Sequence, residues 1–170
     1  MGVLAGWRFC PCCAASVTHH DRRVECDSCG FVQYANSAPT ASALVLDDAG
    51  RVLLARRAHE PDAGLWDVPG GFLEEAEDPL AGLRRELLEE TGVEIVVGRF
   101  VGAFTDTYGD GPDAAAVLNL LWEAKVAGGE PAPADDVSEL RWFSPAALPP
   151  DRELAFRWLA PCLRAWASRT

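Results

Sequence analysis

The apolar residues of this 170-residue chain fall, after residue 38, into short runs separated by turn-forming segments. Ala41–Leu46 and Val52–Ala55 are apolar and partly β-branched, which is typical of strands. Between them, residues 47–50 read Asp-Asp-Ala-Gly, so the three segments together predict a β-hairpin. Residues 56–66 follow, and their proline and glycine predict a loop.

A helix is predicted with both of its ends marked. Asp78 can accept hydrogen bonds as an N-cap, and Pro79 suits the first helical position because its missing N–H needs no partner there. Gly92 should end the helix because glycine adopts the left-handed conformation at little cost. Helical spacing predicts one apolar face, made by Leu80, Leu83 and Leu87.

The second half of the chain predicts more strands and a closing helix. Glycine, aspartate and proline predict a loop over residues 107–113. Asp151–Ser168 has near-helical apolar spacing, which predicts a helix with a kink at Pro161. No internal repeat is present, and the element order predicts an α+β fold. The strands predicted here are Val93–Thr105, Ala116–Val126 and Leu140–Phe143.

Five of the six cysteines lie in the first 29 residues. Cys10 and Cys13 form one Cys-x-x-Cys pair, and Cys26 and Cys29 form another. The 12 residues between the pairs are close to the spacing of a four-thiolate structural zinc site. We therefore predict a zinc ribbon over residues 1–38. So small a unit buries little apolar surface, so the metal would supply its folding free energy and the site would be structural.

Other interpretations of this cluster remain open at the level of sequence. The cysteines could form a redox pair, a disulfide or a ribbon without metal. Cys12 could replace Cys13 as a ligand, and His19 or His20 could replace a thiolate. The sixth cysteine, Cys162, lies among apolar residues and is interpreted as a small buried side chain.

Charge and composition exclude several classes of function. The formal net charge is −11, from 15 lysines and arginines against 26 acidic residues, so nonspecific nucleic-acid binding is not expected. The one lysine, Lys125, follows no glycine-rich loop, which excludes a P-loop. Residues 1–14 lack a signal-peptide pattern and no apolar run is long enough for a membrane span, so we expect a cytoplasmic protein.

Three acids, Glu86, Glu89 and Glu90, lie within five residues on the predicted helix. At about 100° per residue they share a narrow stripe beside the leucine face. Their mutual repulsion needs compensation, which a divalent cation such as Mg²⁺ or Mn²⁺ would supply. Arg85 can pair with Glu89, four residues later. Taken alone, this segment would be interpreted as a solvated surface helix.

The surrounding residues change that interpretation. Gly71, Glu77, Arg85-Glu86, Glu89-Glu90 and Gly92, with aliphatic residues at 87 and 93, stand at the spacing of the signature of the Nudix hydrolases, which this segment resembles at all nine specified positions. The preceding Gly64-x-Trp-x-x-Pro-Gly-Gly also resembles the lead-in of that family. The resemblance covers residues 39–170 and implies an α/β/α sandwich around a mixed sheet, preceded by the zinc ribbon.

The resemblance also implies roles for individual residues. Glu86, Glu89 and Glu90 would ligate Mg²⁺ or Mn²⁺, with a carbonyl of Gly70 or Gly71 as a further ligand. Glu77 and Arg85 would orient the carboxylates. The reaction implied is attack of water on a pyrophosphate bond of a nucleoside diphosphate linked to another group. The ribbon resembles that of NADH and ADP-ribose pyrophosphatases, so ADP-ribose or NAD(H)-like dinucleotides are the expected substrates.

The general base and the substrate contacts are less constrained. Glu89 or Glu139 could act as the base, although Glu139 could equally be a surface residue. Some aromatic residues could stack a nucleobase, with core packing as the alternative. The candidates are Trp66, Phe104, Tyr108 and Trp122. Arg56, Arg57 and Arg99 could bind the distal phosphate or sugar, or each could be an exposed charge.

Two other functions remain as alternatives. The chain could be a noncatalytic nucleotide- or RNA-sensing module that uses the ribbon for interaction, or it could share the fold with isomerases of isopentenyl diphosphate. The complete set of carboxylates and the uncharged balance of the ribbon favour the hydrolase. A homodimer is also implied by the resemblance.

Overall fold

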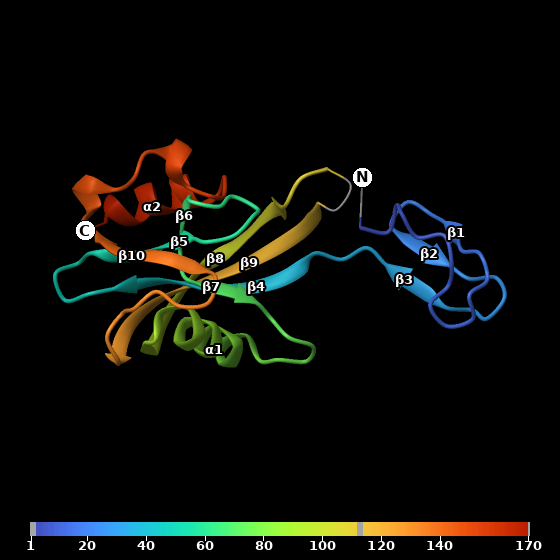
Figure 1. Ribbon diagram of the computed structural model, residues 1–170, viewed down its shortest axis with the longest axis horizontal. Helices are drawn as coiled ribbons and strands as arrows, with labels where there is room; N and C mark the ends of the chain where they lie inside the picture. The colour runs from blue at the N-terminus through green and yellow to red at the C-terminus, as the bar shows by residue number, and fades with distance from the viewer. Residues whose placement is uncertain (1–2, 112–113, 170) are drawn as a thin grey trace.

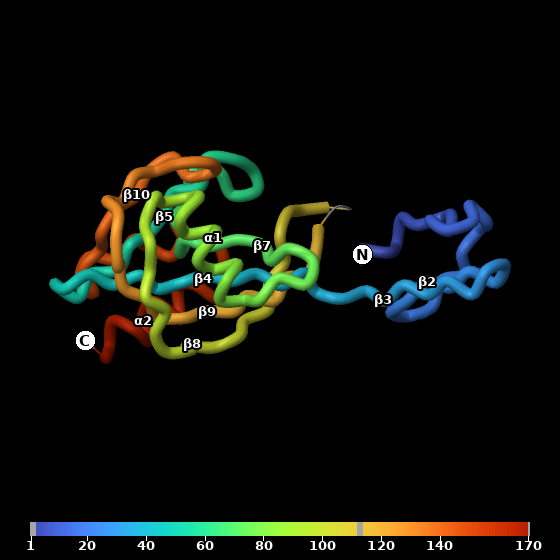
Figure 2. The backbone as a smooth tube through the Cα atoms, turned by 90° about the horizontal axis from the view of Figure 1, so that it is seen from below, coloured from blue at the N-terminus to red at the C-terminus, as the bar shows by residue number. Residues whose placement is uncertain are grey.

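The computed structural model describes residues 3–111 and 114–169, so residues 112 and 113 of the predicted loop lie outside it. Within that part of the chain a small three-stranded sheet lies to one side of a larger mixed sheet (Figures 1 and 2). The small sheet has the order β1-β2-β3, and all of its pairs are antiparallel. Its strands are β1 (Thr18–His19), β2 (Arg23–Glu25) and β3 (Val32–Tyr34).

The large sheet has the order β10-β5-β4-β9-β8, with β6 added beside β5 and β7 beside β4. Only β4 and β9 run parallel, whereas the other pairs are antiparallel. This mixed sheet confirms the fold that the resemblance implied. Its strands are β4 (Ala38–Leu46), β5 (Val52–Arg57), β6 (Trp66–Asp67), β7 (Gly70–Phe72), β8 (Glu94–Tyr108), β9 (Ala115–Gly128) and β10 (Val137–Phe143).

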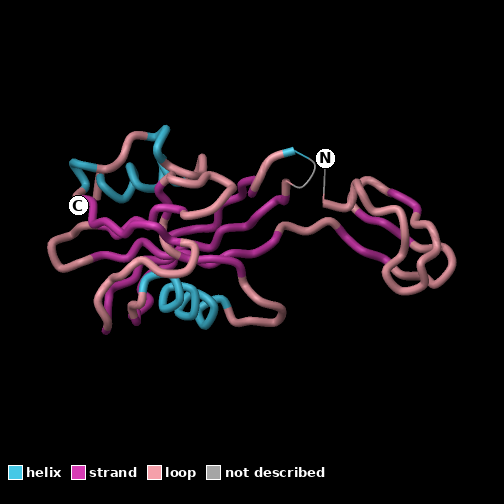
Figure 3. The backbone as a smooth tube through the Cα atoms, in the orientation of Figure 1, coloured by secondary structure: helices cyan, strands magenta, loops and turns pink. Residues whose placement is uncertain are grey.

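Helices cover both faces of this sheet (Figures 1 and 3). Helix α1 (Pro79–Thr91) packs on one face, and α2 (Leu159–Ala167) on the other, together with the short 3-10 helices η2 (Pro145–Ala147) and η3 (Asp151–Glu153). Because both faces are covered, β4 is apolar on each side: Leu44 packs with the α2 layer, while Ala43 and Val45 pack with the α1 layer.

Helix α1 begins and ends where its sequence predicted. The side chain of Asp78 accepts hydrogen bonds from the backbone N–H groups of Leu80 and Ala81, each at 3.0 Å. Gly92 ends the helix in the left-handed conformation, with φ of 69°, and donates to the Leu88 carbonyl. These local signals fix which turns of the helix carry the acidic residues.

The predicted kink at Pro161 is wrong. Helix α2 begins at Leu159, so Pro161 lies in its first turn, where a missing backbone N–H breaks no intrahelical bond. Residues 151–158 form no α-helix and include only η3. The predicted loop over residues 56–66 is also shorter, because both of its end residues belong to paired strands.

The boundary between the two units stays a prediction. Strand β4 begins at Ala38, one residue before the predicted start of the second domain. Among the described residues, no helix has both the length and the apolar character needed to span a membrane.

We expect Asp78→Ala to lower the free energy of unfolding by about 1 kcal/mol, because two N–H groups at the start of α1 lose their acceptor. Urea unfolding at neutral pH measures this loss. Asp48→Ala is the control, since Asp48 is exposed and only faces Lys125 at 3.9 Å. Equal losses in the two variants would contradict the capping role.

Candidate active site

A pair of glycines brings the segment before α1 against strand β4. Gly70 pairs with Ser42, and Gly71 pairs with Ala41. Gly70 has φ of 136°, and a Cβ atom there would lie 2.3 Å from the Ala41 carbonyl oxygen. A Cβ atom on Gly71 would lie 2.4 Å from Oε2 of Glu86. A larger residue at position 70 would therefore separate the loop from β4, whereas a larger residue at position 71 would displace the Glu86 carboxylate.

Two carboxylates from successive turns of α1 lie against this glycine pair. Glu90 is only 7% exposed, and its Oε2 accepts a hydrogen bond of 2.8 Å from the Gly70 N–H. Burial raises the pKa of Glu90 to about 9, and the charges of Asp136 and Asp67 act in the same direction. Burial also raises the pKa of Glu86. This excess of buried negative charge, carried by hard oxygen atoms, fits a divalent cation such as Mg²⁺ or Mn²⁺.

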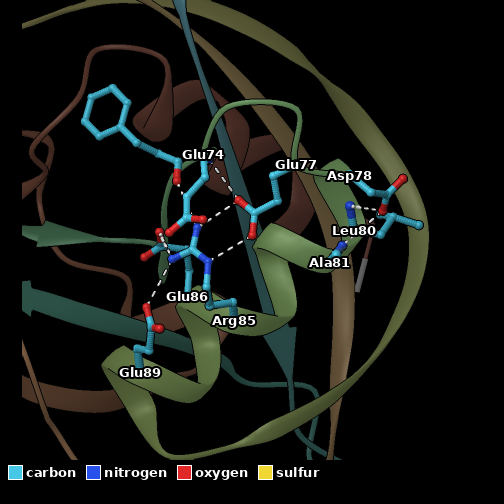
Figure 4. Close-up of polar contacts among 9 residues, drawn as sticks. Glu74, Glu77, Asp78, Leu80, Ala81, Arg85, Glu86 and Glu89 are labelled. Atoms are coloured by element: carbon cyan, nitrogen blue, oxygen red, sulfur yellow. Dashed lines mark hydrogen bonds and ion pairs between the residues drawn. The ribbon is translucent and has the colours of Figure 1, made fainter.

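Arg85 fixes the acidic face of the helix, as the close-up in Figure 4 shows. Its Nε and Nη2 atoms each donate to one oxygen of Glu77 at 2.9 Å, which is the bidentate geometry that suits arginine and carboxylate. Its Nη1 donates to Oε1 of Glu86 at 2.7 Å and to Glu89 at 3.1 Å. The hydrogen bonds of this guanidinium therefore hold the three glutamate side chains in place.

The three predicted metal-ligating glutamates consequently lie in different environments. Glu86 and Glu90 line a cleft, whereas the Glu89 side chain is 50% exposed and turns toward Arg85. The hydrogen bonds to Arg85 lower the pKa of Glu77 to about 2, so this carboxylate is charged throughout the neutral range.

The cleft has an acidic region and an aromatic region. The acids come from α1, from β6 and from the loop before β10, and the aromatic rings come from β7, β8 and the segment before α2. Asn119 on β9 also lines the cleft and accepts a hydrogen bond of 2.8 Å from Thr40. The lining consists of Thr40, Ser42, Ala55, Arg57, Asp67, Val68, Gly70–Phe72, Glu86, Glu90, Tyr108, Val117, Asn119, Asp135–Val137, Phe156 and Trp158.

The sulfur atoms of Cys10, Cys13, Cys26 and Cys29 all lie within 4.8 Å of one another. Cys10 and Cys29 sulfurs are 3.6 Å apart, and Cys13 and Cys26 sulfurs are 3.5 Å apart. Cys12 stays outside this group and donates its backbone N–H to the Cys10 sulfur at 3.3 Å.

Neither histidine beside the cluster joins it. His19 contacts the carbonyl oxygen of Trp7 at 2.6 Å, and His20 contacts Glu25 at 3.3 Å. The turns after the two cysteine pairs place Ala14 and Gly30 at positive φ, 59° and 75°. The structure therefore favours the set of four cysteines over the sets in which Cys12 or a histidine replaces one of them.

A sequence model of the NUDIX domain matches residues 36–164. The chain belongs to the NUDIX family. The match contains the glycine pair, helix α1 and every residue that lines the cleft.

Several curated proteins are similar to this chain. A MutT-like protein of Streptomyces ambofaciens is 33% identical over 110 residues, 65% of each protein. The NAD-capped RNA hydrolase NudC of Pseudomonas aeruginosa is 32% identical over 146 residues, 84% of this chain and 50% of that protein. An ADP-ribose pyrophosphatase of Methanocaldococcus jannaschii is 30% identical over 112 residues, 66% of this chain and 63% of that protein. The chain therefore spans less than two thirds of each relative's length.

Solved structures show the same fold. A NUDIX hydrolase from Nitrosomonas europaea superposes with a TM-score of 0.80 at 24% identity, over 95% of this chain and 91% of the other. A MutT NUDIX hydrolase from Burkholderia pseudomallei has a TM-score of 0.61 at 26% identity, over 75% of this chain and 96% of the other.

Besides Glu77, Arg85 and Glu89, several other residues of the predicted NUDIX site do not line the cleft. Trp66 is 3% exposed and packs edge-on against Phe143 in the core. Phe104 stacks on Trp158 with ring centroids 4.9 Å apart. Arg56 and Glu139 pair with each other at 3.2 Å outside the cleft.

Other lining residues escaped the sequence analysis. Asp67 follows Trp66 in the lead-in segment, and burial raises its pKa to about 7 against the opposing effect of Arg57. Asp135 and Asp136 precede β10 in an alanine- and proline-rich loop, and Ala134 in that loop donates to the Glu90 carbonyl at 3.0 Å. The pair of consecutive aspartates was the one sequence feature that could have indicated a site here. Only the contact between this loop and Glu90 shows that the pair lies near α1.

We expect Glu77→Gln to destabilise the NUDIX domain at about pH 7, because Arg85 loses its charged bidentate partner. The pKa of Glu77 is lowered to about 2, so its ion pair stabilises the fold above its ordinary pKa of about 4.3 and this contribution is lost as pH falls toward 2. The difference in unfolding free energy between wild type and variant should therefore shrink over that range.

Urea unfolding at several pH values measures this difference. Glu75→Gln is the matched control, because Glu75 is exposed two residues away and makes no hydrogen bond or ion pair within residues 3–111 and 114–169. A pH-independent difference for Glu77→Gln would show that the ion pair is not its source.

Proposed function

We propose that this chain is a Mg²⁺- or Mn²⁺-dependent pyrophosphohydrolase that cleaves nucleoside diphosphate-linked compounds, with ADP-ribose or NAD(H)-like dinucleotides as substrates. The observation that carries the proposal is the placement of Glu86 and Glu90 beside Gly70 and Gly71 in one cleft. Relatives named NAD-capped RNA hydrolase NudC and ADP-ribose pyrophosphatase support the substrate class.

Each side chain of the site takes a distinct part in this proposal. Glu86 and Glu90 would hold the metal, with a carbonyl of Gly70 or Gly71 as a further ligand. One oxygen of Glu86 is bonded to Arg85 and one oxygen of Glu90 to Gly70, so the protein orients each carboxylate before a metal binds. When bound, the cation supplies a Lewis acid for phosphate oxygens and for a water molecule.

The geometry gives Glu89 and Glu139 less support as metal ligands or as the general base. Glu89 is half exposed and bonded to Arg85, so we assign it, with Glu77, to holding that arginine in place. Glu139 lies outside the cleft, between Arg56 and Arg141, and receives no catalytic role in the proposal. Three aspartates line the cleft and replace Glu139 as candidates for the general base: Asp67, Asp135 and Asp136.

The alternative of a noncatalytic sensor is less favoured. A sensor would have no need to keep buried carboxylates under mutual repulsion, and burial with repulsion is what raises the pKa of Glu90. The cytoplasmic location and the homodimer stay predictions of the sequence.

We expect Glu86→Gln and Glu90→Gln each to lower Mg²⁺-dependent release of AMP from ADP-ribose by roughly 100-fold or more, because each removes a charged ligand from the site. Initial rates at saturating Mg²⁺ measure the loss. Glu75→Gln is again the control, since it lies on the surface away from the cleft. Full activity of either cleft variant would refute the assignment of metal ligands.

We also propose that the four clustered cysteines bind a structural zinc ion. Tetrahedral zinc with Zn–S bonds of about 2.3 Å places sulfur atoms about 3.8 Å apart. The closest sulfur pairs, at 3.5 and 3.6 Å, approach that spacing. With all four positions taken by thiolates, such a site has no place for a catalytic water.

We expect about one zinc ion per wild-type chain and a loss of zinc in Cys26→Ser, because three thiolates hold zinc less tightly than four. Metal analysis of the purified protein measures the zinc content. Cys12→Ser is the matched control, because Cys12 is exposed and lies outside the cluster. Loss of zinc in Cys12→Ser with retention in Cys26→Ser would reverse the assignment.

A further inference from the structure

Arg57 at the end of β5 is the one arginine or lysine among the residues that line the cleft in the described part of the chain. The same cleft holds five carboxylates, so an anionic substrate meets a strongly negative surface. A divalent cation bound at Glu86 and Glu90 would neutralise part of this negative charge. Arg57 is the cation that the protein itself supplies on the other side.

The guanidinium of Arg57 is held in place chiefly by neutral groups. Its Nε donates to the Pro61 carbonyl at 2.8 Å, and its Nη2 donates to the hydroxyl of Tyr108 at 3.2 Å. It also lies 5.5 Å from the ring centre of Tyr108 and 5.6 Å from that of Phe156. Contacts from three separate segments therefore fix its orientation.

Most of the donors of Arg57 remain available to a ligand. A guanidinium has five N–H donors, and these two hydrogen bonds use only two of them. The nearest carboxylate, Asp67, is 3.7 Å from Nη1, which is longer than a hydrogen bond. Arg85 contrasts with this arrangement, because its donors are already bonded to Glu77, Glu86 and Glu89.

The ring of Tyr108 already contacts three neighbouring side chains. Its ring meets Phe72 edge-on, with centroids 5.2 Å apart, and lies nearly parallel to Phe156 at 6.4 Å. The guanidinium of Arg57 lies against the same ring. Its hydroxyl, by contrast, accepts a hydrogen bond from Arg57, which lines the cleft.

We propose that Arg57 binds phosphate oxygens of the substrate's diphosphate and that the hydroxyl of Tyr108 is a positioning group that orients this guanidinium. The inference rests on the proposed function and adds to it a specific contact for the phosphate chain. A planar guanidinium with free N–H groups matches the geometry of a phosphate, whereas a lysine at this position would offer only a point charge.

The test compares binding and turnover in Arg57→Gln and Arg57→Lys. Calorimetric titration with ADP and Mg²⁺ should show Arg57→Gln binding about 10- to 100-fold more weakly than wild type, with Arg57→Lys between them. For ADP-ribose hydrolysis, kcat/KM should fall by a similar factor. Arg152→Gln is the control, because Arg152 is exposed on η3 and pairs only with the neighbouring Glu153.

Tyr108→Phe tests the positioning role. This variant keeps the ring and removes the hydroxyl, so ADP binding should weaken by about 3- to 10-fold. Combined with Arg57→Gln, it should add no further loss, because the hydroxyl acts through the arginine. Independent, multiplying losses would show that Tyr108 contacts the ligand by another route and would overturn the positioning role.

The two proposals fail in different ways. If wild type cleaves no diphosphate-linked compound, the proposed function fails, while ADP titration of the variants still decides the role of Arg57. If wild type cleaves ADP-ribose but Arg57→Gln binds ADP as wild type does, the phosphate contact is refuted. Thermal melting of every variant identifies a folding defect, and a variant that melts like wild type but loses ADP binding supports the contact.

Discussion

The gathering of carboxylates beside one helix is the constraint on which this structure depends. Glu86 and Glu90 face the same cleft and are buried enough to raise their pKa values. Such an arrangement is unfavourable unless neighbouring groups offset it. The protein offsets it with the Gly70 N–H at Glu90 and with Arg85, which contacts Glu86 while Glu77 holds it in place. What remains unbalanced is the negative charge that suits a divalent cation.

Backbone geometry makes this electrostatic arrangement possible. Gly70 and Gly71 let β7 pair with β4 and still approach Glu86 within the space that a Cβ atom would fill. The caps at Asp78 and Gly92 set where α1 begins and ends. Glu86 and Glu90 therefore lie beside a sheet that is packed on both faces, so the elements that position them have little freedom to move.

The N-terminal unit follows a different principle of stability. Its strands are two or three residues long, and few of its side chains are buried. Its four clustered cysteines lie close together, two of them buried and two exposed. The proposed zinc ion would stabilise this unit, whereas the NUDIX domain has apolar packing on both faces of a mixed sheet.

The sequence by itself determined the features that are encoded locally. The N-cap, the helix-ending glycine, the two cysteine pairs and the spacing of acids along α1 all act within a few residues, so their patterns are readable without a fold. The signature residues likewise indicated the family because their spacing follows one loop and one helix. Pro161 was misread because a proline in a first turn and a proline at a kink differ only in where the helix begins.

Only the tertiary structure decided which of two neighbouring side chains faces the cleft. Arg56 and Arg57 are adjacent on β5, and Trp66 and Asp67 are adjacent on β6. Successive side chains of a strand point to opposite faces, so Arg57 and Asp67 line the cleft while Trp66 enters the core. The register between β5 and β6, and the packing of distant segments beyond them, select that face. No pattern within either short strand contains this information.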